Sequence, residues 1–239
     1  MRSRCGRGGY IAGMHAKAFD HVAVWAAERD ALARVLTACC GMHEIERTQT
    51  FTLVGGDARR GKLTLFDADG PRDSGALERV VVRVPDLAES RRCLEASKVA
   101  AGEGHDGAVS VAAPSQLPLA LVQGDGVADL DHVVLRVGDP PAAAAALESM
   151  GLERSGDEVH VLDKRLVLRS GGARETDRPL LNHLAFLVDA AAEIEAEARE
   201  RGLEIDDVVD AANTRAVFIW GPERIRLEYV EHKPGFSLA

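Results

Sequence analysis

The chain has 239 residues, with 29 Lys and Arg against 38 Asp and Glu, which gives a net charge of −9. Its 46% hydrophobic and 28% charged residues are typical of a folded globular protein and exclude an intrinsically disordered chain. No apolar run approaches the ~20 residues of a membrane-spanning helix, and the lack of a basic cluster argues against nucleic-acid binding. We therefore expect one large or two small domains that bind a small molecule.

The N-terminal segment and the cysteines give two further expectations. Residues 1–17 are basic and glycine-rich, lack the apolar core of a secretion signal, and are predicted to form a disordered extension. The cysteines are not spaced as metal ligands; they are Cys5, Cys39, Cys40 and Cys93. We interpret them as small buried residues of a protein in the reducing cytoplasm.

A repeat of roughly 50–60 residues runs through the chain. Four strand-like segments open alike, and their third positions hold His21, Arg79, His132 and His183. Each opening is followed by a segment with helical periodicity and then by short strands. The last strand of each unit is predicted near residues 62–66, 117–123, 165–168 and 224–230. The repeat predicts an α+β fold of four βαβββ units.

The simplest arrangement of four such units is two domains of two units each. The glycine-rich stretch 124–129 is the best candidate for the linker between them. The predicted domains are therefore residues 18–124, which hold the first two units, and residues 128–239, which hold the last two.

The repeat, the openings Asp20-His21 and Asp131-His132, and the ending from Gly221 to Tyr229 resemble the vicinal oxygen chelate superfamily. That group includes glyoxalase I, bleomycin and fosfomycin resistance proteins, methylmalonyl-CoA epimerase and type I extradiol dioxygenases. The resemblance covers almost the whole chain. It implies that two units pair into a half-open, curved sheet that holds one divalent metal, with ligands from the first and last strands of each unit.

The ligand positions that this resemblance implies make the two predicted domains unequal. In the domain 128–239 they fall on His132, His183 and Glu228, with Val167 in the fourth position. Two imidazoles and one carboxylate form the facial set associated with non-haem Fe(II). One Fe(II) ion is therefore the expected cofactor, with Mn(II), Zn(II) or Ni(II) as alternatives.

In the domain 18–124 the same positions fall on His21, Arg79, Thr64 and Ala120. One imidazole beside a guanidinium cannot hold a cation, so this domain is predicted to be metal-free and structural. His21 is interpreted as a packing residue.

Two further histidines are candidates for proton transfer, because the unperturbed pKa of histidine lies near neutrality. His160 would face the fourth ligand position if Asp163 and Lys164 formed a two-residue turn. His232 would share a strand face with Glu228. Candidate substrate contacts lie in and just before the penultimate strand, at Asn213, Arg215 and Phe218.

The predicted function is that of a metal-dependent dioxygenase acting on a catechol-like substrate whose vicinal oxygens chelate Fe(II). The alternatives are a glyoxalase-like lyase or isomerase, a thiol transferase, and a non-catalytic protein that sequesters its ligand as bleomycin resistance proteins do. The expected partner is a small molecule, without nucleic acid or membrane, and a homo-oligomer is left open. The expected location is the cytoplasm.

Overall fold

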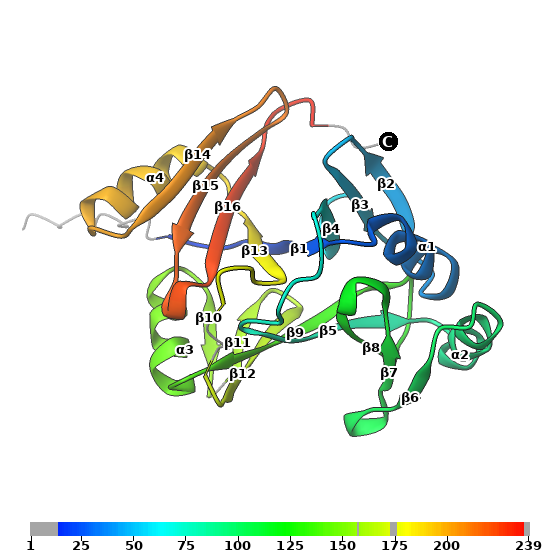
Figure 1. Ribbon diagram of the computed structural model, residues 1–239. Coiled ribbons are helices and arrows are strands. Elements are labelled where there is room, and N and C mark those ends of the chain that lie inside the picture. The colour runs from blue at the N-terminus through cyan, green and yellow to red at the C-terminus, as the bar shows by residue number, and fades with distance from the viewer. Residues whose placement is uncertain (1–13, 157, 173–175, 237–239) are drawn as a thin grey trace, which may run out of the picture.

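The computed structural model describes residues 14–156, 158–172 and 176–236 (Figure 1). Residues 1–13 of the expected N-terminal extension lie outside the described residues. The remainder of that segment packs against the fold, because Ala16 donates its backbone N–H to Gly151 and Lys17 donates to Leu187. The ordered structure therefore includes residues 14–17, which the sequence had assigned to a disordered extension.

The four predicted βαβββ units are present. The first unit consists of β1 (Ala18–Ala26), α1 (Arg29–Cys39), β2 (His43–Arg47), β3 (Phe51–Gly55) and β4 (Lys62–Asp67). The second consists of β5 (Leu77–Val84), α2 (Leu87–Ala96), β6 (Ala101–Glu103), β7 (Val109–Ala112) and β8 (Pro118–Gln123). The third consists of β9 (Asp129–Val137), α3 (Pro140–Ser149), β10 (Glu153–Ser155), β11 (Glu158–Val161) and β12 (Lys164–Ser170). The fourth consists of β13 (Leu181–Leu187), α4 (Ala191–Glu200), β14 (Ile205–Asp210), β15 (Thr214–Trp220) and β16 (Arg226–His232).

Short 3-10 turns complete the described elements, at η1 (His105–Gly107), η2 (Pro114–Gln116) and η3 (Pro222–Arg224). Three of the four α-helices end near a glycine with positive φ, namely Gly41, Gly151 and Gly202, because glycine adopts the left-handed conformation without steric cost. None of the helices within the described ranges is long and apolar enough to cross a membrane.

The units pair into two curved, eight-stranded sheets (Figure 1). One sheet has the order β14-β15-β16-β13-β1-β4-β3-β2 and is built from the first and fourth units; we call it the terminal sheet. The other has the order β10-β11-β12-β9-β5-β8-β7-β6 and is built from the second and third units; we call it the central sheet. In each sheet the two units meet through their first strands, which run antiparallel: β1 with β13, and β5 with β9.

This pairing corrects the predicted domains 18–124 and 128–239. The stretch 124–128 does not separate two domains, because it is a short connection between β8 and β9 of one sheet. The connections 68–76 and 171–180 are longer, and each carries the chain from one sheet to the other. They run beside each other at Asp73 and Pro179, which form an isolated bridge.

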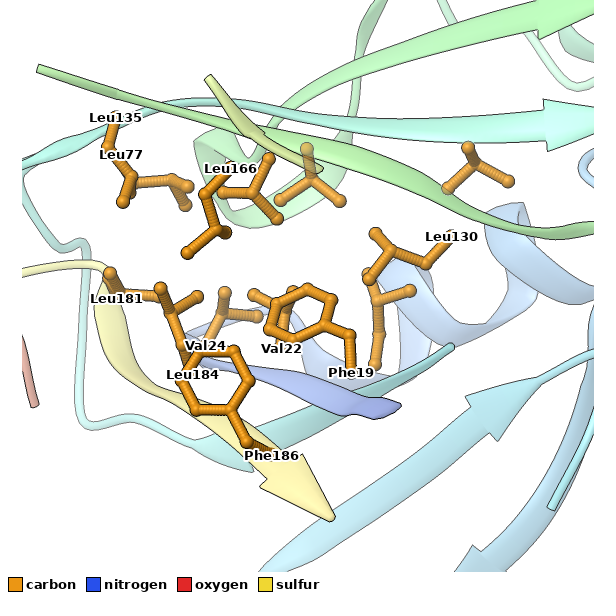
Figure 2. Close-up of a cluster of buried hydrophobic side chains, with 14 of the residues drawn as sticks. Phe19, Val22, Val24, Leu77, Leu130, Leu135, Leu166, Leu181, Leu184 and Phe186 are labelled. Atoms are coloured by element: carbon orange, nitrogen blue, oxygen red, sulfur yellow. The ribbon is translucent and has the colours of Figure 1, made fainter. Parts of the chain in front are cut away.

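The main hydrophobic core lies between the two sheets (Figure 2). Phe19, Val22 and Val24 of β1 and Leu184 and Phe186 of β13 are fully or almost fully buried there. They face leucines of the central sheet, among them Leu77, Leu130, Leu135 and Leu166. Side chains alternate along a strand, and the register shift in β1 between Phe19 and His21 turns His21, like His183, to the opposite, concave face of the terminal sheet.

A disulfide joins Cys39, at the end of α1, to Cys93 in α2. This bond corrects the interpretation of the two cysteines as unpaired. Helices α1 and α2 belong to units of different sheets, but the two helices pack side by side. Cys40 is free and buried, and burial raises the pKa of its thiol to about 12. The cysteines consequently no longer support a reducing compartment, and the cytoplasmic location stays a prediction.

Candidate metal centre

The concave face of the terminal sheet brings together His21, His183 and Glu228. His183 pairs with Ala23 of β1, so the two histidines stand on neighbouring strands two residues apart in register. Glu228 of β16 pairs with Ala185 of β13, which places its carboxylate on the same face. His21 Nε2 lies 2.9 Å from His183 Nε2, and Glu228 Oε2 lies 2.9 Å from His183 Nε2 and 3.3 Å from His21 Nε2.

Both imidazoles are oriented by the residue that precedes them. Asp20 Oδ1 accepts a hydrogen bond from His21 Nδ1 at 2.7 Å, and Asn182 Oδ1 accepts one from His183 Nδ1 at 2.8 Å. With each Nδ1 occupied in this way, each Nε2 faces the shared point, where its lone pair would be available to a bound ion. Outer partners of this kind fix the tautomer and ring orientation of metal-ligating histidines.

The donor set fits a divalent transition metal. Ligand atoms that surround one ion at about 2.1 Å and near right angles lie about 3 Å apart, which is the separation of the three donor atoms here. Two nitrogen donors and one carboxylate oxygen suit Fe(II), Mn(II), Zn(II) and Ni(II). The fourth register position, on β4 beside Ala23, holds Thr64, which supplies no strong ligand.

The electrostatics of the cluster also favour a bound cation. Burial raises the pKa of Glu228, but the charge of His183 and hydrogen bonds from both histidines outweigh it and hold the pKa at about 2. Burial lowers the pKa of His183. Burial also lowers the pKa of His21, but hydrogen bonds to Asp20 and Glu228 outweigh this and raise it to about 9. In the metal-free protein a proton on His21 therefore occupies the place of the cation.

Asp20 connects this cluster to a buried lysine. Asp20 and Lys62 are each 2% exposed, and Lys62 Nζ donates to Asp20 Oδ2 at 3.0 Å. His232 Nε2 lies 3.1 Å from the same oxygen. Burial raises the pKa of Asp20, but the charge of Lys62 and hydrogen bonds from the two histidines lower it far below its usual value. Asp20 therefore stays ionised and holds His21 in place.

A cavity of about 380 Å³ opens on the cluster. Four aromatic rings line it, from Phe51, Phe66, Phe218 and Phe236. The rings of Phe218 and Phe66 lie 5.2 and 6.1 Å from that of His183, both edge-on. We call this cavity, with the three donor residues at its base, the metal cup.

Two of the residues predicted from sequence, His132 and His160, do not lie in the metal cup. His132 belongs to β9 of the central sheet, whereas His183 and Glu228 belong to the terminal sheet, so the predicted set His132/His183/Glu228 is wrong. His21 occupies the position in the cluster that was predicted for His132. The interpretation of His21 as a packing residue is therefore corrected.

His160 was placed by assuming a turn at Asp163 and Lys164. The turn instead falls at Leu162 and Asp163, because Val161 pairs with Lys164. His160 therefore lies opposite Arg165, and its Nε2 is 3.5 Å from Glu158.

The remaining predicted residues lie in the fourth unit. His232, Asn213 and Phe218 line the metal cup. Strand β16 extends to His232, whose ring stacks on Phe236 at 3.7 Å. Arg215 does not line the cup: its guanidinium donates to Glu195 of α4 at 2.7 Å, because Arg215 points to the helix-covered face of the sheet.

Comparisons with known proteins agree with this architecture. No protein-family model and no curated protein matches the sequence. Among solved structures, a candidate dioxygenase from Bacillus subtilis superposes with a TM-score of 0.72 at 17% identity, over 93% of this chain and 87% of that one. Glyoxalase I from Zea mays superposes with a TM-score of 0.71 at 16% identity, over 90% of this chain and 92% of that one.

A third similar structure, the cppA protein from Streptococcus pneumoniae, superposes with a TM-score of 0.61 at 13% identity, over 90% of this chain and 98% of that one. At these identities the comparisons establish the fold. The chain has the vicinal oxygen chelate fold, as the sequence resemblance predicted.

Proposed function

We propose that the protein is a divalent-metal-dependent enzyme whose ion is held by His21, His183 and Glu228. The observation that carries the proposal is the convergence of His21 Nε2, His183 Nε2 and Glu228 Oε2 within hydrogen-bonding distance of one another at the base of a cavity. Three protein donors leave further coordination positions for substrate, as a catalytic metal requires. We further propose that the ion is Fe(II) and that the reaction is a dioxygenation.

The cavity suits a flat substrate with two adjacent oxygens at one edge. Phe66 and Phe218 flank His183 edge-on, so an aromatic ring above the donors would meet apolar walls. Thr64 and Asn213 add hydroxyl and amide groups to the lining, and the charged side chains of Asp20 and Lys62 in it are paired with each other. These features favour a catechol-like molecule over a highly charged one.

The proposed reaction balances without a further reductant. Both atoms of O₂ enter the product, the ring carbon–carbon bond beside the diol breaks, and the electrons come from the ring. Bound Fe(II) would supply the site at which the two substrate oxygens and O₂ are brought together. The protein's own residues orient the ring, exclude water from it and move the proton of the substrate hydroxyl.

His232 is the side chain we propose for that proton transfer. It lines the cavity, and Asp20 fixes its Nε2 at 3.1 Å. Lys62, which also lines the cavity, is committed to Asp20 and to the carbonyl of Ala58. His232→Gln should therefore lower kcat by roughly 100-fold or more while the metal content stays unchanged.

The metal ligands are tested first, by metal analysis of purified variants. Glu228→Gln and His21→Ala should each lose the ion that the wild-type chain holds at one per chain. Glu231→Gln and His132→Ala are the matched controls and should retain it. Glu231 lies on the same strand but accepts a hydrogen bond from the backbone of Ala191, and His132 has the same Asp-His context in the other sheet. Loss of the ion in His132→Ala instead of His21→Ala would refute the assignment.

The reaction is tested by loading the protein with Fe(II) under anaerobic conditions and adding a panel of catechols. Oxygen uptake that matches ring-cleaved product one to one supports the dioxygenase. The alternative, a glyoxalase-type isomerase, is suggested by the superposition on the maize enzyme. It predicts turnover of methylglyoxal with glutathione in the Ni(II) or Zn(II) form and no oxygen uptake. Metal binding without any turnover would favour a ligand-sequestering protein.

A further inference from the structure

The concave face of the central sheet carries a second cavity, of about 320 Å³. Arg79 of β5, His132 of β9 and Arg165 of β12 supply much of its polar lining. Val81, Ala108 and Val167 supply small apolar surface beside them. We call this cavity the arginine cup. None of these residues belongs to the metal cluster, so the cup can be considered independently of the proposed function.

Arg79 stands where the metal cup has His21. In the terminal sheet, His183 pairs with Ala23, two residues after His21. In the central sheet, His132 pairs with Val81, two residues after Arg79. The same register therefore directs the Arg79 and His132 side chains to the same face and toward each other. A permanently charged guanidinium occupies the position from which the other cup contributes a metal ligand.

The other arginines of the arginine cup are already paired. Arg165 lies 3.2 Å from Glu158 and 3.7 Å from Asp131, and Arg169 donates to Glu78 at 3.3 Å. Arg79 is half-buried, and no ion pair or side-chain hydrogen bond joins it to any residue within the described ranges. Asp106 also lines the cavity, and no ion pair joins it to Arg79 among the described residues.

We propose that the arginine cup binds the carboxylate or phosphate group of a small molecule through Arg79. A guanidinium presents two parallel N–H donors that match the geometry of either oxyanion. A half-buried guanidinium that pairs with none of the described residues attracts such a group strongly, because partial burial weakens screening by water. Val81, Ala108 and Val167 leave room for a short apolar body, so the ligand has one oxyanion on a small frame.

The test is calorimetric titration of the full-length protein with inorganic phosphate and, separately, with pyruvate at constant ionic strength. We expect saturable binding of at least one probe, with one site per chain. Arg79→Gln should weaken it at least tenfold, and Arg79→Lys should weaken it less. Arg92→Gln removes an exposed arginine of α2 paired with Glu89 and should leave the affinity unchanged. The better probe tells whether the natural ligand carries a phosphate or a carboxylate.

Two further variants locate the binding. His21→Ala removes a donor of the metal cup, so affinity that persists in this variant belongs to the other cavity. Val167→Phe fills the arginine cup from β12 and should abolish binding even if Arg79→Gln folds poorly. Equal affinity in wild type and Arg79→Gln, loss of binding only in His21→Ala, or no saturable binding of either probe would overturn the proposal.

Discussion

The two cups share one frame and differ in what stands at four positions. The metal cup has His21, His183, Glu228 and Thr64 at these positions. The corresponding residues of the arginine cup are Arg79, His132, Val167 and Ala120. The strand register is the same in both sheets, so the backbone does not determine which cup can hold an ion. The side chains at these few positions do.

The residues that orient the histidines recur in more of the units than the candidate metal ligands do. In three units the residue before the histidine accepts a hydrogen bond from its Nδ1: Asp20, Asp131 and Asn182. In the same units a basic residue on the last strand approaches that side chain, through the pairs Lys62–Asp20, Arg165–Asp131 and Arg226–Asn182. The difference is burial: the side chains of Lys62 and Asp20 are 2% and 3% exposed, against 39% and 25% for Arg165 and Asp131.

The test with the largest expected effect converts the arginine cup into a second metal site. Arg79→His places an imidazole on the same face as His132, two residues away in register, and Val167→Glu places a carboxylate beside Val134, as Glu228 lies beside Ala185. The double variant should bind two divalent ions per chain where the wild type binds one, as measured by metal analysis after dialysis. Val167→Glu alone supplies only two donors and should stay at one ion. One ion in the double variant would show that the frames are not equivalent.

A smaller effect should separate the two aspartates that orient the histidines. Asp20→Asn should weaken metal binding about 10–100-fold, because it removes the charge behind His21. It should also lower the free energy of unfolding by about 3 kcal/mol, because buried Lys62 loses its carboxylate. Asp131→Asn should leave metal affinity unchanged and alter stability by less than about 1 kcal/mol. Chelator competition and denaturant unfolding measure the two quantities, and equal behaviour of the two variants would contradict the distinction.

The mildest test is the pH dependence of metal binding by the wild-type protein. In the metal-free protein the pKa of His21 is raised to about 9 and that of Glu228 is lowered to about 2. Between pH 6.5 and 8.5 one proton must therefore leave His21 when the ion binds, whereas Glu228 is already ionised. Affinity should rise about tenfold per pH unit, as measured by chelator competition with Zn(II). A slope of zero or two would contradict this single displaced proton.

Much of the fold could be predicted from sequence because each unit carries its own periodic pattern. The last strand predicted near residues 165–168 is β12 (Lys164–Ser170), and that predicted near 224–230 is β16 (Arg226–His232). Glu228 and His183, which the sequence predicted to act together, do lie in one cluster of possible donor atoms. These features depend on local side-chain alternation, which a single unit already contains.

The pairing of the units could not be predicted in the same way. Combining the fourth unit with the first or with the third gives two histidines and one carboxylate in either case, since His21 and His132 occupy equivalent positions. The glycines of 124–128 read as a domain boundary, yet this short connection keeps the second and third units in one sheet. The greater lengths of the connections 68–76 and 171–180 were the available signal for the correct pairing, because a connection that crosses between sheets needs a longer chain.

The order of the units also affects how the molecule is built. The central sheet is continuous in sequence from Leu77 to Ser170, so its strands follow one another during synthesis. Strand β1 precedes the central sheet in the chain but pairs with β13, which follows it, and Glu228 lies later still, in β16. The apolar face of β1 packs against the central sheet in the folded protein. The metal cup is therefore complete only when the first and fourth units, which the whole central sheet separates in the chain, have paired.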